Sequence, residues 1–278
     1  MKYRELIRRF RNKKIKLFSY GKVKEKGKAY ELFKIVADNH SQKTLLITSG
    51  FHGEEYNGPI SLLEIIDEVI DYAKKKKVNL IIYPCVNPSG FDLRQRYNAS
   101  SEEKNNDFLR YEVKRGKWLD IVRPGQKFLR YKIVFSPAKE VRALQKDLQK
   151  SGEVPVGVLD IHQDNELKKC DFYAYVLDKR DVYKKIMLKL DRLGRRCRNA
   201  KPREVKEGYE FDDTINREGF IVTHDGTITD MFWRFGSVYS VVAETNTKTP
   251  LKKVAAINKL WVFGLLDLIA GSKKNDKK

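Results

Sequence analysis

Apolar and polar residues alternate in blocks that predict the first elements of the chain. Residues 3–12 place apolar side chains on one side of a short amphipathic helix. Residues 15–37 have the pattern of a β-hairpin around a polar turn, and the apolar run at 44–49 predicts a third strand. From Gly58 onward, apolar residues recur at helical spacing, which predicts a longer helix.

The same reading extends to the rest of the chain. Continuous apolar runs predict buried strands at 78–86, 156–162, 171–177 and 236–244. Helices are predicted at 181–197 and 250–270, whereas 87–135 and 198–218 are polar and irregular. Because short apolar strands alternate with helices, we predict an α/β fold with a mixed, mostly parallel twisted sheet and helices on both faces. We expect one domain over residues 1–272 and a disordered basic tail at 273–278.

Composition places the chain among soluble globular proteins with a heavily charged surface. Its 278 residues are 41% hydrophobic and 34% charged, which is enough to bury a large core. The formal net charge of +20 favours attraction of anions such as acidic peptides. The lysines are scattered and no nucleic-acid-binding motif is visible, so we do not expect a nucleic-acid partner.

Cysteine usage and hydropathy favour a cytoplasmic protein. Cys85, Cys170 and Cys197 are odd in number and widely spaced, which predicts reduced thiols in a reducing compartment. The basic N-terminal stretch lacks the apolar segment of a secretory signal. The most apolar stretch, 260–271, is too short to span a bilayer, so we interpret it as a core helix and expect no membrane association.

Side chains capable of chemistry follow three of the predicted strands. His52 and Glu55 form the pattern H-x-x-E after one strand, His162 ends a second, and Glu244 ends a third. Sites in open α/β sheets form at the carboxyl ends of strands. Two histidines and one glutamate can give Zn²⁺ three protein ligands, and a second carboxylate, Glu244, can then act as general base. Each residue also has a plain structural explanation: a polar loop, a histidine hydrogen-bonded to Asp160, or an ordinary strand end.

The order of these motifs resembles the zinc carboxypeptidase family. H-x-x-E after a strand is followed by NPSGF at 87–91, by a strand ending in histidine, and by Y-S-x-x-x-E near the C-terminus. The segment 226–245 is similar to the stretch that precedes the catalytic glutamate in that family. The related succinylglutamate desuccinylase and aspartoacylase group shares the H-x-x-E, the later histidine and the glutamate.

The resemblance implies specific roles for individual residues. His52, Glu55 and His162 would bind one zinc ion per chain, and Glu244 would be the general base. For the substrate, the resemblance implies contacts from Asn105, which matches an asparagine of the family, and from Tyr239, which falls in register before Glu244. Val222 occupies the position of the family's mobile tyrosine, and we expect His224, two residues on, to reach the same space as a further catalytic residue.

One expected residue is missing. Asn106 occupies the position where the family has a substrate-binding arginine. Because a guanidinium is the natural clamp for a carboxylate, we expect another arginine to replace it. Arg96 is the preferred candidate because it follows NPSGF, with Arg94 and Arg110 as alternatives.

Three functions are compatible with these observations. The first is a zinc-dependent hydrolase of amide bonds, expected to be a metallocarboxypeptidase that acts on peptide C-termini, including acidic peptides. The second is a deacylase of small N-acyl amino acids. The third is a non-catalytic basic binding protein on the same scaffold, suggested only by the net charge.

Overall fold

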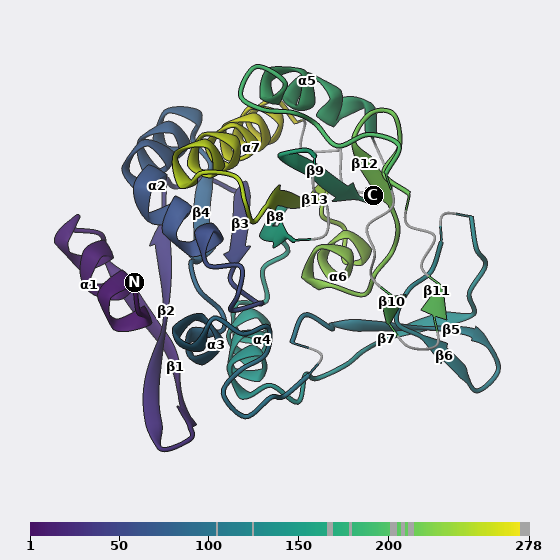
Figure 1. Ribbon diagram of the computed structural model, residues 1–278, viewed down its shortest axis with the longest axis horizontal. Coiled ribbons are helices and arrows are strands. Elements are labelled where there is room, and N and C mark those ends of the chain that lie inside the picture. The colour runs from purple at the N-terminus through teal and green to yellow at the C-terminus, as the bar shows by residue number, and fades with distance from the viewer. Residues whose placement is uncertain are drawn as a thin grey trace.

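The structure is a computed structural model (Figure 1). It describes residues 1–272 apart from residues 104, 124, 166–168, 178–179, 201–204, 207–208 and 211–213. The predicted tail at 273–278 lies outside the described residues.

A mixed sheet of eight strands forms the centre of the molecule, in the order β1-β2-β4-β3-β8-β13-β9-β12. The strands are β1 (Leu17–Glu25), β2 (Lys28–Ala37), β3 (Thr44–Ser49), β4 (Asn79–Tyr83), β8 (Gly157–Asp164), β9 (Phe172–Val176), β12 (Phe220–Val222) and β13 (Tyr239–Asn246). The four central strands β4, β3, β8 and β13 are parallel, and antiparallel pairs occur towards both edges. The parallel centre brings the carboxyl ends of β3, β8 and β13 to one edge of the sheet.

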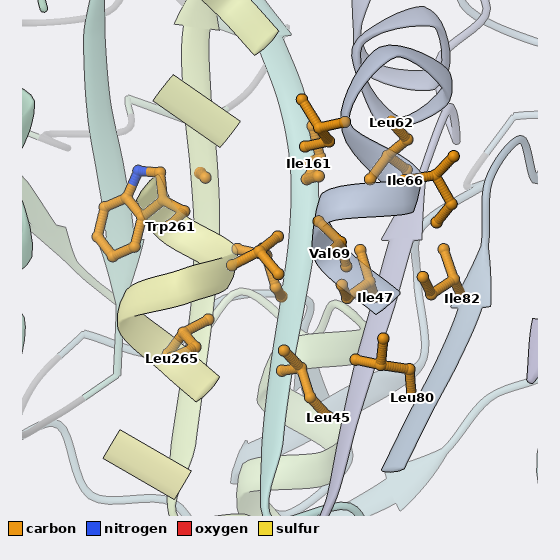
Figure 2. Packing of buried hydrophobic residues seen from close by; sticks show 14 of the residues in the cluster. Leu45, Ile47, Leu62, Ile66, Val69, Leu80, Ile82, Ile161, Trp261 and Leu265 are labelled. Carbon is orange, nitrogen blue, oxygen red and sulfur yellow. The ribbon is translucent and has the colours of Figure 1, made fainter. Parts of the chain in front are cut away.

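One face of the sheet is covered by α2 (Asn57–Lys76), α5 (Arg180–Leu190) and α7 (Leu251–Gly271). Leu62, Ile66 and Val69 of α2 pack against strand residues such as Leu45, Ile47, Leu80, Ile82 and Ile161, while Trp261 and Leu265 come from α7 (Figure 2). All of these side chains are buried. At the outer edge, α1 (Tyr3–Asn12) packs against α2 and against the short α3 (Pro88–Leu93).

The opposite face carries α4 (Lys139–Ser151) and α6 (Ile228–Arg234) (Figure 1). A separate small sheet of β5 (Leu109–Lys114), β6 (Lys117–Leu119) and β7 (Arg130–Ile133) joins the same apolar cluster. A two-stranded ribbon, β10 (Val205–Lys206) and β11 (Tyr209–Glu210), completes the described strands. The predicted α/β class, with a mixed sheet between helical layers, is therefore confirmed.

The prediction that residues 87–135 are irregular is wrong. This stretch contains α3 and the small sheet β5–β7. Its strands are short and β7 is fully exposed, so they lack the continuous apolar pattern of a buried strand. β5 is partly buried through Leu109 and Tyr111, but polar residues separate them, so the sequence does not show the apolar run of a buried strand.

The expectation of three reduced cysteines is wrong for two of them. Cys170 and Cys197 form a disulfide across 27 positions of sequence, and Cys85 is a buried free thiol. The pair is close because residues 171–172 run beside 195–197, with backbone hydrogen bonds between the two segments. The argument for a reducing compartment from unpaired cysteines therefore loses its basis, and the location stays a prediction.

The closing helix α7 is long and apolar enough, by length and composition alone, to cross a membrane. In this fold, Val254, Trp261, Leu265 and Ile269 are buried against α2 and the sheet. The expectation that this region is too short to span a bilayer is therefore wrong, because the helix extends over 21 residues, and the interpretation of α7 as a core helix rests on its buried side chains.

Candidate metal centre

The loop after β3 carries the first two residues of the site. His52 and Glu55 lie between the end of β3 and the start of α2, and Glu55 is buried. Two buried amides fix this loop, because the Asn87 and Asn105 side chains both donate hydrogen bonds to the carbonyl of Phe51. The loop therefore holds His52 in a defined place before any ligand binds.

His162, near the end of β8, completes a compact group. Glu55 stands between the two imidazoles: its Oε1 is 2.5 Å from His52 Nδ1 and its Oε2 is 2.8 Å from His162 Nδ1. Candidate ligand atoms of His52, Glu55 and His162 all lie within 4.8 Å of one another. The backbone amide of Gln163 also donates to Glu55 Oε2, at 3.0 Å. The structure thus brings together the three residues that the sequence analysis predicted as metal ligands.

Asp160 orients His162 from behind. The Nε2 atom of His162 lies 2.9 Å from Asp160 Oδ2, which leaves Nδ1 facing the cluster. Asp160 is completely buried and accepts two further hydrogen bonds, from Thr48 Oγ1 at 2.8 Å and from Asn106 Nδ2 at 2.9 Å. A carboxylate that receives the outer N–H of a histidine is the usual support for a metal-binding imidazole, because it fixes the tautomer and the ring orientation.

The three titrating groups influence one another strongly. Burial alone would raise the pKa of Glu55, but the neighbouring His52 and His162 outweigh it and hold that pKa well below its ordinary value. Burial lowers the pKa of His52, although Glu55 opposes the shift. Burial would also lower the pKa of His162, but Asp160 and Glu55 raise it well above its ordinary value. The group is therefore built around an ionised carboxylate.

Glu244 lies on the strand next to His162. In the parallel pairing of β13 with β8, Glu244 is opposite His162, so both side chains stand on the same face of the sheet. Neighbouring strands are about 4.8 Å apart, so the Glu244 side chain lies next to that of His162.

Arg96 is the arginine that the structure brings to this cluster. Its Nη1 atom is 3.4 Å from Glu54 Oε1 and 3.9 Å from Glu55 Oε1, and its side chain is 36% exposed. Arg94 instead lies over the ring of Tyr56, and Arg110 pairs with Asp120. Of the three candidate arginines, Arg96 is thus the one that lies beside the cluster, and its predicted contact with substrate remains a prediction.

Asn105 and Asn106 have internal partners. Besides the Phe51 carbonyl, Asn105 Nδ2 donates to the carbonyl of Arg96 at 3.2 Å, so Asn105 ties two loops of the site together. Asn106, in the position of the family's arginine, contacts Asp160 and lies 3.3 Å from His162 Nε2. Its supporting role behind the metal cluster was not foreseen, since the pattern indicated only a lost arginine.

His224 belongs to a second polar group on the α6 face. Its Nδ1 is 3.1 Å from Asp230 Oδ1, and Asp230 also contacts the hydroxyl of Tyr111. The backbone of His224 pairs with Val122, which ties the segment after β12 to the segment between β6 and β7 of the small sheet. Among the described residues His224 contacts Asp230, Trp233 and Val122, so its predicted catalytic role remains a prediction.

Tyr239 does not share the site with Glu244. It is the first residue of β13 and packs in the core with Val241 and Ala243, on the face covered by α2 and α7. Residues 239 and 244 are separated by five positions, an odd number, so their side chains point to opposite faces of the strand. The predicted substrate contact of Tyr239 is therefore not supported. The odd spacing between residues 239 and 244 in the sequence already indicated that their side chains face opposite sides of the strand.

The residues present fit a transition metal such as zinc. Two imidazole nitrogens and one carboxylate form a donor set that zinc prefers, and three protein ligands leave an open coordination position. The carboxylate of Asp160 supports His162, and the carboxylate of Glu244 lies on the neighbouring strand.

Comparison with known families gives a partial sequence match. The family model of the succinylglutamate desuccinylase/aspartoacylase catalytic domain matches residues 41–118. This range contains His52, Glu55 and Arg96 but ends before His162 and Glu244. A comparison with curated proteins finds no match.

Solved structures share the whole fold. A protein from Shewanella amazonensis, provisionally named a metallopeptidase, aligns with a TM-score of 0.68 at 20% identity over 97% of this chain and 93% of that chain. Bovine thrombin-activatable fibrinolysis inhibitor aligns with a TM-score of 0.61 at 16% identity, over 97% of each chain. A metallo-carboxypeptidase from Pseudomonas aeruginosa aligns with a TM-score of 0.58 at 14% identity, over 96% of this chain and 68% of that chain. The resemblance to the zinc carboxypeptidases and their desuccinylase/aspartoacylase relatives is thus confirmed, by the shared fold and by the family match at residues 41–118.

Proposed function

We propose that the protein is a zinc-dependent hydrolase of amide bonds. The observation that carries this proposal is the position of Glu244, which stands beside the His52–Glu55–His162 cluster on the same face of the sheet as His162. A structural metal site has no need of a further carboxylate next to its open position, whereas amide hydrolysis requires a base there.

The roles of the residues follow from their positions. His52 Nδ1, Glu55 and His162 Nδ1 would hold the ion, and Asp160 keeps the His162 ring in the required tautomer. When bound, zinc supplies a Lewis acid that polarises a carbonyl and makes a water more acidic. The Glu244 carboxylate accepts a proton from the attacking water and delivers it to the leaving nitrogen.

Arg96 supports a substrate that carries an anionic group near the scissile bond. Of the three candidate arginines, it is the one that pairs with Glu54 and Glu55 beside the cluster. A guanidinium can bind a carboxylate through two parallel hydrogen bonds, which would fix the distance from that carboxylate to the metal. Peptide C-termini and N-acyl amino acids both present such a carboxylate.

Of these two classes we propose peptide C-termini, so that the enzyme is a metallocarboxypeptidase. Support comes from the fold, which is shared with proteins named as carboxypeptidases over nearly the whole chain. The match of residues 41–118 to the desuccinylase/aspartoacylase model favours the second candidate, a deacylase of small N-acyl amino acids.

The deciding experiment compares both substrate classes on one zinc-loaded preparation. We would offer a panel of short peptides that differ in the C-terminal residue, beside N-succinyl and N-acetyl amino acids, and measure release of amino acid. The matched variant is Glu244→Gln, which keeps the shape of the side chain but cannot accept the proton. Cleavage by the wild type that disappears in the variant, with zinc content unchanged, would support the hydrolase.

Failure on every substrate by a protein that binds zinc would overturn the hydrolase and favour the third function, a binding protein. A salt-sensitive interaction with an acidic peptide would then be the expected activity, given the net charge of +20. A cytoplasmic location is part of the proposal and remains to be measured by fractionation.

A further inference from the structure

A second cluster of carboxylates lies outside the catalytic site. Glu25 ends β1, Glu102 lies in the loop between α3 and β5, and Glu140 stands in the first turn of α4. Carboxylate oxygens of these three residues lie within 4.8 Å of one another. Three segments that are distant in the sequence therefore converge on one point with acidic side chains.

Most oxygens of this acidic cluster have partners that hold them in place. Asn98 Nδ2 donates to Glu102 Oε2 at 2.7 Å and to Glu140 Oε2 at 3.0 Å. Ser100 donates to Glu25, and Lys139 Nζ is 3.0 Å from Glu25 Oε1. The carboxylates are therefore fixed by neutral donors and by one ammonium group.

One oxygen is different. Glu140 is only 1% exposed, and its Oε1 atom has no hydrogen-bond partner among the described residues. A buried carboxylate oxygen without a donor is costly, because its hydration has been removed and nothing has replaced it. This oxygen can therefore bind a ligand without losing a hydrogen bond within the described part of the protein.

The charges of the cluster do not balance. When all three carboxylates are ionised they carry three negative charges, and Lys139 supplies one positive charge among the described residues that contact them. In that state two negative charges are left without a cation among the described residues. A proton on one carboxyl group would remove one of these charges, whereas a divalent cation would neutralise both.

We propose that Glu25, Glu102 and Glu140 form a second metal site, which binds one calcium ion. All available donors are oxygens, which suits hard cations and not zinc. Calcium accepts several carboxylates in flexible geometry, while magnesium demands a strict octahedron and usually takes only one or two carboxylates. Bound calcium would tie the end of β1, the loop after α3 and the start of α4 together, so its role is to stabilise the fold.

The test is a calcium titration of chelator-treated protein that has been reloaded with one equivalent of zinc. We expect calorimetry to show about one calcium ion per chain and the Tm to rise by about 5 °C at saturating calcium. Glu140→Gln removes the charge of the buried carboxylate with little change of shape. Glu102→Gln makes the same change at a more exposed carboxylate of the cluster. Both variants should bind calcium at least about tenfold more weakly.

Two controls separate this site from others. Glu68→Gln makes the same chemical change at an exposed glutamate of α2 and should leave the calcium response intact. His52→Ala disables the proposed catalytic site and should also keep the response, so the two proposals can fail independently.

Absence of calcium binding by the wild type would overturn the proposal. Wild-type calcium binding in both Glu140→Gln and Glu102→Gln would also overturn it. An equal rise in Tm with magnesium at the same concentration would overturn the assignment of calcium.

Discussion

The support that Asp160 gives to His162 can be tested by a single isosteric change, Asp160→Asn. The new amide can direct its oxygen to His162 and Asn106 while its NH₂ group faces the Thr48 hydroxyl, which can rotate to accept. The hydrogen-bond pattern is then preserved and only the negative charge is lost. The variant therefore isolates the electrostatic part of the support.

The size of the effect follows from the geometry. A charge-assisted hydrogen bond at 2.9 Å in a completely buried position is worth about 1.5–3 kcal/mol more than an unmade one. Replacing the charged carboxylate by a neutral amide should remove much of this stabilisation, so that His162 becomes less basic and a weaker metal ligand. Loss of such outer support typically weakens metal binding by about 10–100-fold, which corresponds to about 1.4–2.7 kcal/mol. We therefore expect the zinc Kd to rise by a factor within that range.

The assay is a competition titration of zinc against a chromophoric chelator, with far-UV circular dichroism to confirm folding. The matched control is Asp147→Asn, which alters a carboxylate of α4 that also accepts from two donors, Lys34 and Tyr83. The control should keep the wild-type Kd. A Kd for Asp160→Asn within about twofold of the wild type would refute the reasoning, because the charge would then contribute nothing to the metal site.

Three further predictions concern other residues. Glu244→Gln should lower kcat on the best substrate by about 10²–10⁴-fold with zinc content unchanged, as measured by initial rates and metal analysis; activity near that of the wild type would exclude Glu244 as the base. Burial raises the pKa of Glu140 to about 7 from 4.5, so the folded protein holds this proton more tightly than the unfolded chain. In calcium-free protein, the resulting stabilisation of about 3 kcal/mol is complete below pH 4.5 and is lost as the pH rises through about 7. Urea unfolding between these pH values should show this slope in the wild type and not in Glu140→Gln, and equal slopes would contradict the burial argument. Replacing both Cys170 and Cys197 by serine should lower the free energy of unfolding by about 3 kcal/mol, because the bridge closes a loop across 27 positions; an unchanged urea midpoint would show that the disulfide does not constrain the unfolded chain.

The part of the site that lies on buried strands could be predicted from the sequence. His162 and Glu244 end continuous apolar runs, and such runs identify buried parallel strands whose carboxyl ends meet at one edge. His52 and Glu55 follow a third run of the same kind. In these cases the local pattern determines where the side chains go.

The remaining features depend on contacts between distant segments, which leave no local pattern. Glu25, Glu102 and Glu140 are isolated acidic residues in the sequence, and only the fold brings them together. Asn106 likewise gains its role from Asp160, which lies on another strand. Tyr239 is a different case, because the resemblance to a family outweighed the simple rule that alternate strand residues face opposite sides.

The carbonyl of Arg96 accepts hydrogen bonds from three donors, the Gly53 amide and the side chains of Asn87 and Asn105. The backbone at position 96 is thereby fixed to the loop that holds His52, and these hydrogen bonds do not depend on the identity of the side chain. Under the proposed function, replacing Arg96 by lysine or glutamine would change the group offered to the substrate while these backbone hydrogen bonds keep the His52 loop in place. The same separation would give natural variation a position where specificity changes without unfolding the loop that carries His52.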